Sequence, residues 1–402
     1  MKSDFFDYFE RVLSEEEMAA FKRQLSRPAR LALRVNTLLM DDEPEILKKY
    51  FKNVEKIPWS PHGYFYESGV SIGNTELYEK GKVYSQEASS QIAVELLDVH
   101  PGQTILDLCA SPGSKTTQIA AVCENDAFVI ANEVADDRHR NMKNNLKHFG
   151  VICTALTNLD PAYFATSHPN IFDRILVDAP CSGEGMYFKF PAVIHHWNIK
   201  TIRFNAKRQK RILLRAFEAL KPGGKLVYST CTLNLEEDEK VVEHLLKVQD
   251  GNAEIVSKWL KIWPHEFQTG GFFACAITKK KATARATPPL EMFQRRDKKN
   301  FKMHAGRSEA KAMWQICDEK ESRRVLDDLS NLLKDELKGK DMTCPDHYLI
   351  VKHGEIYFFQ HEIFYQKFSA LPIRSLGIPV LVTHEDGTKK TTEEILRWLN
   401  IQ

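Results

Sequence analysis

Between residues 81 and 278, short apolar segments alternate with longer stretches of helical periodicity, and this alternation limits the fold more than any other feature. Short buried strands separated by helices indicate βαβ units, which build a doubly wound, mostly parallel α/β sheet. The segment 271–278 predicts an edge strand that closes this sheet. The other predicted strands are 104–108, 128–132, 174–179 and 225–230, and the predicted helices are 115–123, 136–149 and 205–220.

Residues 1–80 have the pattern of a small α/β unit in front of the main domain, residues 81–281. Apolar residues recur at helical spacing from Phe5 to Leu13, and Ser14 followed by three glutamates is typical of a helix N-cap. The alternating, β-branched segment 31–39 predicts a strand. We therefore expect a separate N-terminal domain.

A basic linker, residues 282–312, is expected between the main domain and a small α/β domain at 313–402. Strands are predicted at 347–352 and 355–360, and a final helix is predicted from Thr391. The junction around the linker is either a solvated spacer or an RNA-contacting segment, and its pattern favours neither. Three acidic residues there face eleven basic ones: Lys279, Lys280, Lys281, Arg285, Arg295, Arg296, Lys298, Lys299, Lys302, Arg307 and Lys311.

Composition excludes several classes of protein. A length of 402 residues suits two or three domains, and 43% hydrophobic with 27% charged residues is ordinary for a globular chain. No apolar run approaches the ~18 residues that cross a bilayer, and the first residues lack the apolar core of a signal peptide. The eight cysteines form no C-x-x-C pair, which argues against disulfides and zinc. We expect a cytoplasmic protein without a metal, and because the net charge is only +2, local patches must hold any nucleic acid.

The first segment with a chemical signature is DLCASPGSKTTQIA, residues 107–120. A strand, a glycine turn and a helix start follow one another, so Gly113 allows a ligand close to free backbone N–H groups. Glu133, after the next strand, is placed to accept hydrogen bonds from a ribose, and Asp160 is a candidate for an adenine edge. With one glycine the loop fits neither the dinucleotide fingerprint nor a P-loop, so it predicts a nucleoside cofactor. An ordinary βα turn is the alternative.

Two strand ends each carry one thiol. Asp178, Pro180 and Cys181 follow one predicted strand and Cys231 follows the next, and ligand sites in such sheets lie beyond the carboxyl ends of strands. Two thiols and a carboxylate suit methylation of cytosine at carbon 5. A thiolate that adds to carbon 6 makes carbon 5 electron-rich, and an acid at ring nitrogen 3 stabilises the charge that develops.

A free thiol is only a few per cent ionised at pH 7, so a cationic neighbour such as Lys115 would increase the reactive fraction. Lys115 is equally well interpreted as an exposed lysine at a helix start. The thiol of Cys109 and those of the five remaining cysteines are interpreted as packing.

At these residues the chain resembles the Sun-type RNA cytosine-5 methyltransferases. LDLCASPGSKT, DAPCSGEG and YSTCTLN are similar to that family's cofactor loop, P-C motif and T-C motif, and RVNTL (34–38) to the signature of its N-terminal domain. The resemblance covers roughly residues 20–280 and implies a Rossmann-like domain that binds S-adenosylmethionine, with an RNA-binding N-terminal domain. DAPCSGEGMYFKFP, STCTLNLEEDE and GGFFACAITK further resemble the bacterial small-subunit ribosomal RNA methyltransferase F group, and residues 374–387 resemble its middle domain.

The resemblance also implies roles for single residues. Cys231 corresponds to the nucleophile, Cys181 to the thiol that assists product release, and Asp178 to the contact with the target base, at the border of the cofactor site. The expected cofactor-binding residues are Cys109, Ala110, Ser111, Pro112, Gly113, Ser114, Lys115, Glu133, Asp160 and Asp178.

The implied substrate is a cytosine of 16S rRNA, in naked RNA or in the 30S subunit. A tRNA enzyme and a catalytically silent RNA-binding assembly factor are the alternatives. A DNA enzyme is disfavoured, since Cys231 would then have no role; we expect a monomer without membrane or DNA partners.

Two further features concern RNA. A flipped base needs flanking groups, and Tyr187 and Phe188 either supply them or pack in the core. A basic helix, in which some residues must simply be solvated, contains Lys200, Arg203, Lys207, Arg208, Lys210, Arg211 and Arg215.

Overall fold

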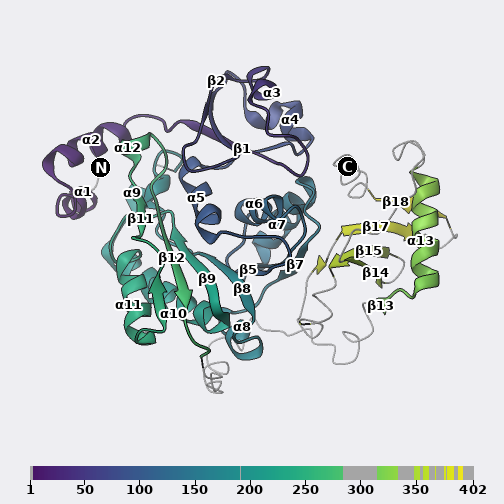
Figure 1. The fold of residues 1–402 in the computed structure, drawn as a ribbon. Coiled ribbons are helices and arrows are strands. Elements are labelled where there is room, and N and C mark those ends of the chain that lie inside the picture. Colours follow the sequence, from purple (N-terminus) through teal and green to yellow (C-terminus); the bar gives the residue numbers. More distant parts are fainter. Residues whose placement is uncertain are drawn as a thin grey trace.

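Three β-sheets with their flanking helices make up the described chain (Figure 1). The computed structural model describes residues 3–190, 192–283, 315–333, 348–353, 356–361, 367, 375–376, 378–383 and 388–392. Within these ranges, no helix combines the length and apolar character that crossing a membrane requires. The basic segment 284–314 lies outside the described residues.

The central sheet contains five parallel strands, flanked by antiparallel ones at both edges. The order is β10 (Ala253–Ile255), β12 (Phe272–Lys279), β9 (Leu220–Thr230), β8 (Phe172–Asp178), β5 (Thr104–Asp107), β6 (Phe128–Asn132), β7 (Thr154–Thr157) and β16 (Ser375–Leu376), and β11 (Leu260–Ile262) also pairs with β12. The predicted doubly wound, mostly parallel sheet is confirmed.

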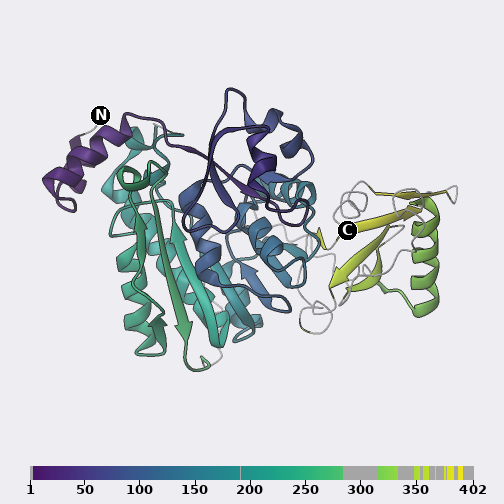
Figure 2. The same ribbon diagram turned by 45° about the horizontal axis from the view of Figure 1, so that its top comes forward.

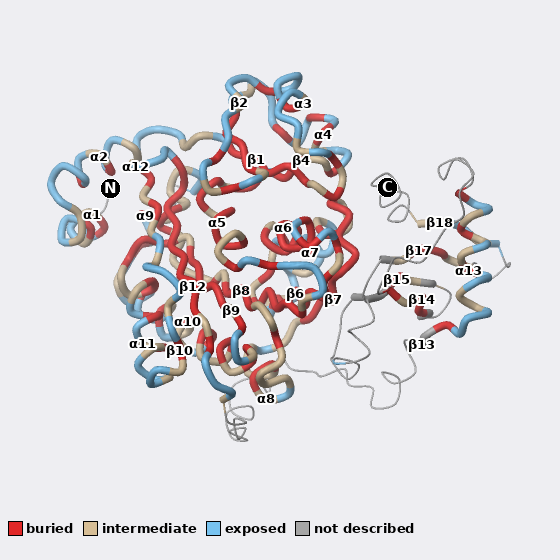
Figure 3. The backbone as a smooth tube through the Cα atoms, in the orientation of Figure 1, coloured by how far each residue is buried: buried red, intermediate tan, exposed pale blue. Residues whose placement is uncertain are grey.

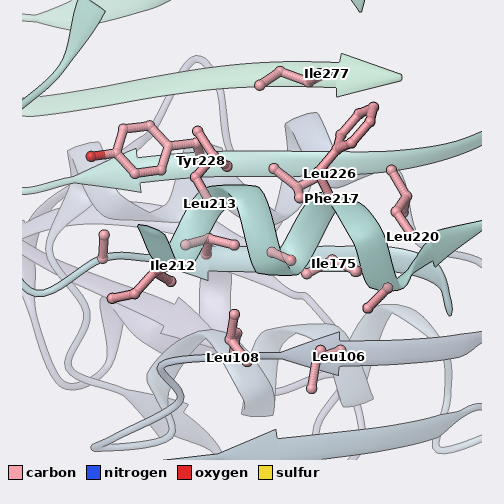
Figure 4. Packing of buried hydrophobic residues seen from close by; sticks show 14 of the residues in the cluster. Leu106, Leu108, Ile175, Ile212, Leu213, Phe217, Leu220, Leu226, Tyr228 and Ile277 are labelled. Carbon is pink, nitrogen blue, oxygen red and sulfur yellow. The ribbon is translucent and has the colours of Figure 1, made fainter. Parts of the chain in front are cut away.

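Alternate residues of the central strands point to opposite faces of the sheet, as the two-residue period of a strand requires. On one face Leu106, Ile175 and Tyr228 pack against α8 (Pro161–Ser167), α10 (Ile199–Ala219) and α11 (Glu239–Gln249) (Figure 4). On the other, Ile105 and Leu176 pack against α5 (Ala88–Leu97), α6 (Ser114–Val122) and α7 (Asp136–His148). Figure 3 shows β6 and β7 buried along their length, because helices cover both faces.

The N-terminal sheet is antiparallel. Its order is β2 (Lys52–Lys56), β3 (Gly63–Glu67), β1 (Leu31–Val35) and β4 (Val83–Tyr84), with α3 (Pro44–Lys48), the 3-10 turn η1 (Ile72–Asn74) and α4 (Glu76–Glu79) around it. Arg34 of β1 is buried and donates to Thr117 Oγ1 of α6 at 2.8 Å, so this sheet is fastened to the helix that follows the glycine loop.

The first two helices precede this sheet in the chain and lie apart from it, beside the green strands of the main domain (Figure 2). They are α1 (Ser3–Phe9) and α2 (Glu15–Leu25), and the predicted cap of α2 is confirmed, since Ser14 and Glu17 form a capping box. Phe5, Phe9 and Phe21 pack with Trp197 and Leu233 of the main domain, beside α12 (Pro264–Phe267).

The C-terminal sheet runs β13 (Gln315–Ile316), β14 (Tyr348–His353), β15 (Ile356–His361), β17 (Ile378–Thr383) and β18 (Lys389–Thr391), packed against α13 (Glu319–Leu332). Two strands cross the boundaries expected from the sequence: β4 belongs to the N-terminal sheet, and β16 pairs with β7 of the central sheet.

Several sequence expectations were wrong. β12 is not an edge strand, because the short and partly polar β10 and β11, which no periodicity reveals, pair with it. The strand predicted at 31–39 ends at Val35, where the Asn36 side chain accepts from the N–H of Leu38 and starts a turn. Thr391 lies in β18 and does not start a helix; residues 393–402 are outside the described ranges.

Lys279 is neither a solvated nor an RNA-contacting residue of the basic junction. Lys279 is the last residue of β12 and is 1% exposed. Its ammonium donates to the carbonyls of Phe217 and Leu220. Burial lowers the pKa of Lys279 to about 8.

Candidate active site

The loops after β8 and β9 bring two thiols together. These strands are parallel neighbours, with Asp178 in register with Ser229, so the chain leaves both at the same edge of the sheet. The Sγ atoms of Cys181 and Cys231 lie 3.3 Å apart. The hydrogen bond to Cys231, together with burial, raises the pKa of Cys181 well above its ordinary value.

Asp178 stands beside the thiol pair with both carboxylate oxygens occupied. Lys115 Nζ donates to Oδ2 at 2.6 Å, and Ser229 Oγ donates to Oδ1 at 2.9 Å. The Lys115 side chain is only 9% exposed, so its interpretation as an exposed helix-start lysine is wrong. The Lys115 ammonium lies against the carboxylate of Asp178 rather than against a thiol, and the two form an ion pair in the site.

A buried carboxylate joins the two thiol loops. Glu184, in the 3-10 turn η2 (Glu184–Met186) after the P-C motif, is 1% exposed. Its Oε2 accepts from Thr232 Oγ1 at 2.5 Å, Leu233 N at 2.9 Å and Asn234 N at 3.0 Å, all in the loop that follows Cys231. Its Oε1 accepts from Trp197 Nε1 at 2.6 Å. Glu184 thereby fixes the position of one thiol loop relative to the other.

A second buried carboxylate repeats this arrangement from the opposite side. Glu237 Oε2 accepts from Ser182 N at 3.0 Å and from Gln209 Nε2 of α10 at 2.8 Å, and its Oε1 accepts from Asn234 Nδ2 at 3.1 Å. Burial raises the pKa of Glu237. Sequence reasoning missed Glu184 and Glu237. The available signal was that each lies among the acidic residues of a motif, DAPCSGEG and TLNLEEDE respectively.

The glycine loop after β5 is shaped by its own backbone and by α7. Gly113 has φ +99°, a conformation that other residues rarely adopt, and its N–H donates to Ala110 O at 2.6 Å. Arg138 donates to Ser111 O at 2.9 Å, and Asn145 donates to Pro112 O at 2.8 Å. The loop therefore has a fixed form, and α6 starts at its end, at Ser114.

Two of the expected cofactor carboxylates lie in different surroundings. Glu133 directly follows β6, is 4% exposed and pairs with Arg138 at 3.0 Å. Asp160 is exposed and caps α8 by accepting from Ala162 N at 2.9 Å. Cys109 packs partly against the core, and burial raises the pKa of its thiol.

Asn132, which sequence reasoning missed, ties these strand ends together. Its Nδ2 donates to Leu108 O and Leu159 O at 3.2 and 3.0 Å, and its Oδ1 accepts from Thr157 Oγ1 and Leu159 N, each at 2.8 Å. The buried amide thus holds the loops after β5 and β7 at a fixed spacing.

Asp107 is a buried carboxylate with spare acceptor capacity. Its Oδ2 accepts from Thr116 Oγ1 at 2.6 Å, whereas Oδ1 has no hydrogen-bond partner within the described chain. Burial raises the pKa of Asp107 to about 7. A buried acceptor without a donor is costly in a native protein, so Oδ1 is open to a donor from water or from a ligand.

The surface beside the thiols is basic. Four exposed residues on one face of α10 follow at intervals of three, four and four residues: Lys200, Arg203, Lys207 and Arg211. Arg215 instead pairs with Glu218, and Arg208 and Lys210 are half-buried. Tyr187 packs against the N-terminal aromatic cluster, which supports its interpretation as packing. The most exposed phenylalanines of the described chain are Phe190 and Phe204, which sequence reasoning did not single out.

Two family models match the chain. Residues 94–278 match the 16S rRNA methyltransferase RsmB/F family, and residues 1–88 match the N-terminal domain of 16S rRNA methyltransferase RsmF.

Several curated relatives are similar over long stretches. The ribosomal RNA small subunit methyltransferase F of Vibrio atlanticus is 32% identical over 96% of this chain and 81% of its own length. That of Pectobacterium atrosepticum is 36% identical over 72% of this chain, and the match spans 64% of the relative's length. A tRNA (cytosine(49)-C(5))-methyltransferase of Pyrococcus abyssi is 40% identical over 63% of this chain and 82% of its own length.

Solved structures have the same fold. A methyltransferase homolog protein from Pyrococcus horikoshii aligns with a TM-score of 0.60 and 28% identity over 69% of this chain and all of that one. NSun6 from Pyrococcus horikoshii, solved with SFG, aligns with a TM-score of 0.64 and 22% identity over 70% of this chain and 98% of that one, a likeness of fold alone. Together with the family matches and the Rossmann-like sheet, these likenesses establish that the chain belongs to the RNA cytosine-5 methyltransferase family that includes the 16S rRNA methyltransferases RsmB and RsmF.

Proposed function

We propose that this chain methylates carbon 5 of a cytosine in RNA, with Cys231 as the nucleophile. The observation that carries the proposal is the pair of thiols 3.3 Å apart at the ends of β8 and β9, next to the Lys115–Asp178 ion pair. A silent binding protein has no need to keep this set together.

The two thiols divide the work. Cys231 adds through its sulfur to carbon 6 of the cytosine, and carbon 5 becomes the electron-rich position. Asp178 passes a proton from the Lys115 ammonium, 2.6 Å away, to ring nitrogen 3, and this neutralises the negative charge that develops there.

Cys181 acts after the adduct has formed. Its pKa is raised first by the hydrogen bond to Cys231, and this cause disappears once the Cys231 sulfur is bonded to carbon. Cys181 can then release its own proton to solvent more easily and, as a thiolate, accept the proton from carbon 5. The electrons of that C–H bond form the double bond between carbons 5 and 6, and Cys231 leaves as a thiolate.

The residues around the glycine loop fit S-adenosylmethionine. Asp107 offers an acceptor without a donor, Glu133 is a buried carboxylate at the end of β6, and the loop ends in the N-terminus of α6. When bound, S-adenosylmethionine supplies the methyl group. We assign its binding to the Cys109–Lys115 loop with Glu133, Asp160 and Asp178.

The proposed substrate is 16S rRNA, free or within the 30S subunit, with a monomer of this chain acting on it. Similarity over nearly the whole chain to a ribosomal RNA small subunit methyltransferase F supports this choice. The 40% identity to a tRNA cytosine-5 methyltransferase supports tRNA as the second candidate. We propose that residues 1–80, the linker 282–312 and residues 313–402 contact the RNA around a catalytic domain at 81–281.

Transfer of a radioactive methyl group tests the function. The chain is incubated with labelled S-adenosylmethionine and, separately, with 16S rRNA, 30S subunits or tRNA, and the modified nucleotide is identified by mass spectrometry. We expect 5-methylcytosine in rRNA and its complete loss with Cys231→Ala, whereas Cys123→Ala, which removes a core thiol, leaves it in place. Label in tRNA alone would show that tRNA, and not 16S rRNA, is the substrate. Label on a base other than cytosine would refute methylation at carbon 5 of cytosine.

A further inference from the structure

A pocket opens beside Cys181, on α10. It has a volume of about 360 Å³, at the low end of the roughly 300–1,000 Å³ that is usual for small-ligand sites. Cys181 lines it, but Cys231, Asp178, Lys115 and the glycine loop are not among its described lining residues. The pocket therefore shares Cys181 with the reacting groups and adjoins the others.

The walls combine aromatic faces with an amide. Phe190, 59% exposed, stands at the pocket, and the buried Trp197 is held by its hydrogen bond to Glu184 and by edge contact with Phe5, with 5.9 Å between ring centroids. Thr201 and Asn205 also line the pocket, four residues apart on one face of α10. The Asn205 side chain has no hydrogen-bond partner among the residues that the structure describes.

The charge around the pocket favours a nucleic-acid strand. Lys200, Arg203 and Lys207 are exposed in the same turns of α10 as Thr201 and Asn205, so phosphates can be held along the helix while a base turns into the pocket. An aromatic face stacks on any base, and a free amide can read a base edge.

We infer that this pocket holds the unstacked base of a nucleotide adjoining the target cytosine. The inference rests on the proposed function, because the target base itself must lie on the side of Cys181 that faces Cys231 and Asp178. It makes Phe190 and Asn205 determinants of sequence context, and it restricts the substrate to an unpaired RNA segment, since two neighbouring bases leave the stack together.

Abasic nucleotides in the RNA test the inference. They are introduced by splinted ligation immediately before or after the cytosine that the wild-type chain methylates, in the RNA that it methylates. Phe190→Ala is compared with Phe204→Ala, a matched control, because Phe204 is 70% exposed on α10 and does not line the pocket.

We expect one of the two abasic sites to lower kcat/KM about 10-fold for the wild type and for Phe204→Ala, the scale of one base–aromatic stack. Phe190→Ala should lose about 10-fold on intact RNA and little more on the abasic RNA, with an unchanged urea midpoint. Asn205→Ala should reduce the differences in kcat/KM among RNAs that carry each of the four bases at that position.

Other results overturn the inference in distinguishable ways. If Phe190→Ala and Phe204→Ala behave alike, or if the abasic and Phe190→Ala losses simply multiply at both positions, no neighbouring base occupies the pocket. If the wild type methylates no RNA, the proposed function fails first, and this inference fails with it.

Discussion

Two clusters of loops share the carboxyl edge of the central sheet, and they are stabilised differently. The loops after β8 and β9 are joined by buried carboxylates whose oxygens are occupied, with Glu184 accepting from three groups through Oε2 alone. The loops after β5, β6 and β7 are held through backbone carbonyls, by Asn132, Arg138 and Asn145, while Asp107 Oδ1 remains without a partner.

The difference follows from what each cluster must do. Two sulfur atoms that act on one base need a fixed mutual position before the substrate arrives, and buried hydrogen bonds provide it. A loop that takes up a ligand needs a fixed backbone but free acceptors, which the ligand satisfies. The carboxylate oxygens of Glu184 and Glu237 are therefore occupied in the folded chain, although the neighbouring Gln209 Oε1 has no hydrogen-bond partner within the described residues, and we expect a bound ligand to satisfy the free acceptor of Asp107.

Removing the carboxylate of Glu184 should have the largest effect. Glu184→Ala leaves buried donors of Thr232, Leu233, Asn234 and Trp197 unpaired, so the free energy of unfolding should fall by about 3 kcal/mol or more. kcat should fall roughly 100-fold, since small displacements of reacting groups are costly. Urea denaturation and methyl transfer measure both, with Glu243→Ala on the exposed face of α11 as control. If Glu184→Ala and Glu243→Ala had equal stability and equal kcat, Glu184 would not fix the position of the two thiol loops.

Asp107→Asn should separate stability from binding. Burial raises the pKa of Asp107 to about 7, so its stabilising contribution is complete below the unfolded pKa near 4 and is lost as the pH rises through about 7. Relative to wild type, Asp107→Asn should therefore gain about 1–3 kcal/mol at pH 8 and nothing comparable at pH 4. Its affinity for S-adenosylmethionine should fall. Denaturation at both pH values and calorimetric titration measure these effects, and equal affinity would remove Asp107 from the cofactor site.

A pair of glycines tests whether the loop after β5 is shaped for a ligand. Gly113 and Gly102 both have positive φ, +99° and +75°, so an alanine at either should cost about 1–2 kcal/mol of stability. Only Gly113→Ala should weaken S-adenosylmethionine binding, by about 10-fold. Equal binding by both variants would show that the Gly113 turn is merely structural.

The basic face of α10 should give the smallest effect. Lys200→Gln with Lys207→Gln should make the slope of log K against log salt less negative by roughly 1.4–1.8, if each lysine neutralises one phosphate. The control is Lys247→Gln with Lys258→Gln, two exposed lysines elsewhere. Filter binding over a salt series measures the slope, and an unchanged slope would remove this face from the RNA surface.

Local pattern predicted most of the central sheet, because its strands are apolar, buried on both faces and separated by helices. The same topology predicts that Cys181 and Cys231 lie together, because each follows the carboxyl end of a neighbouring parallel strand. The pattern of apolar residues could not predict β10, β11 or β16. These strands are two or three residues long, and they form because the folded chain brings them beside β12 or β7.

The candidate site was predicted less completely than the fold. Thiols and motif carboxylates are visible in sequence, whereas the partners of Glu184, Asn132 and Lys115 are brought in by packing from distant segments. The Lys115 ammonium was expected near a thiol, and its carboxylate partner Asp178 lies 63 residues away in the sequence.

Trapping of the covalent intermediate tests the division of work between the thiols most directly. Cys181→Ala is incubated with S-adenosylmethionine and the RNA substrate, and the products are separated under denaturing conditions beside Cys231→Ala and the double variant. We predict a stable protein–RNA adduct with Cys181→Ala and none when Cys231 is absent. An adduct that survives in the double variant, or turnover by Cys231→Ala, would contradict the account.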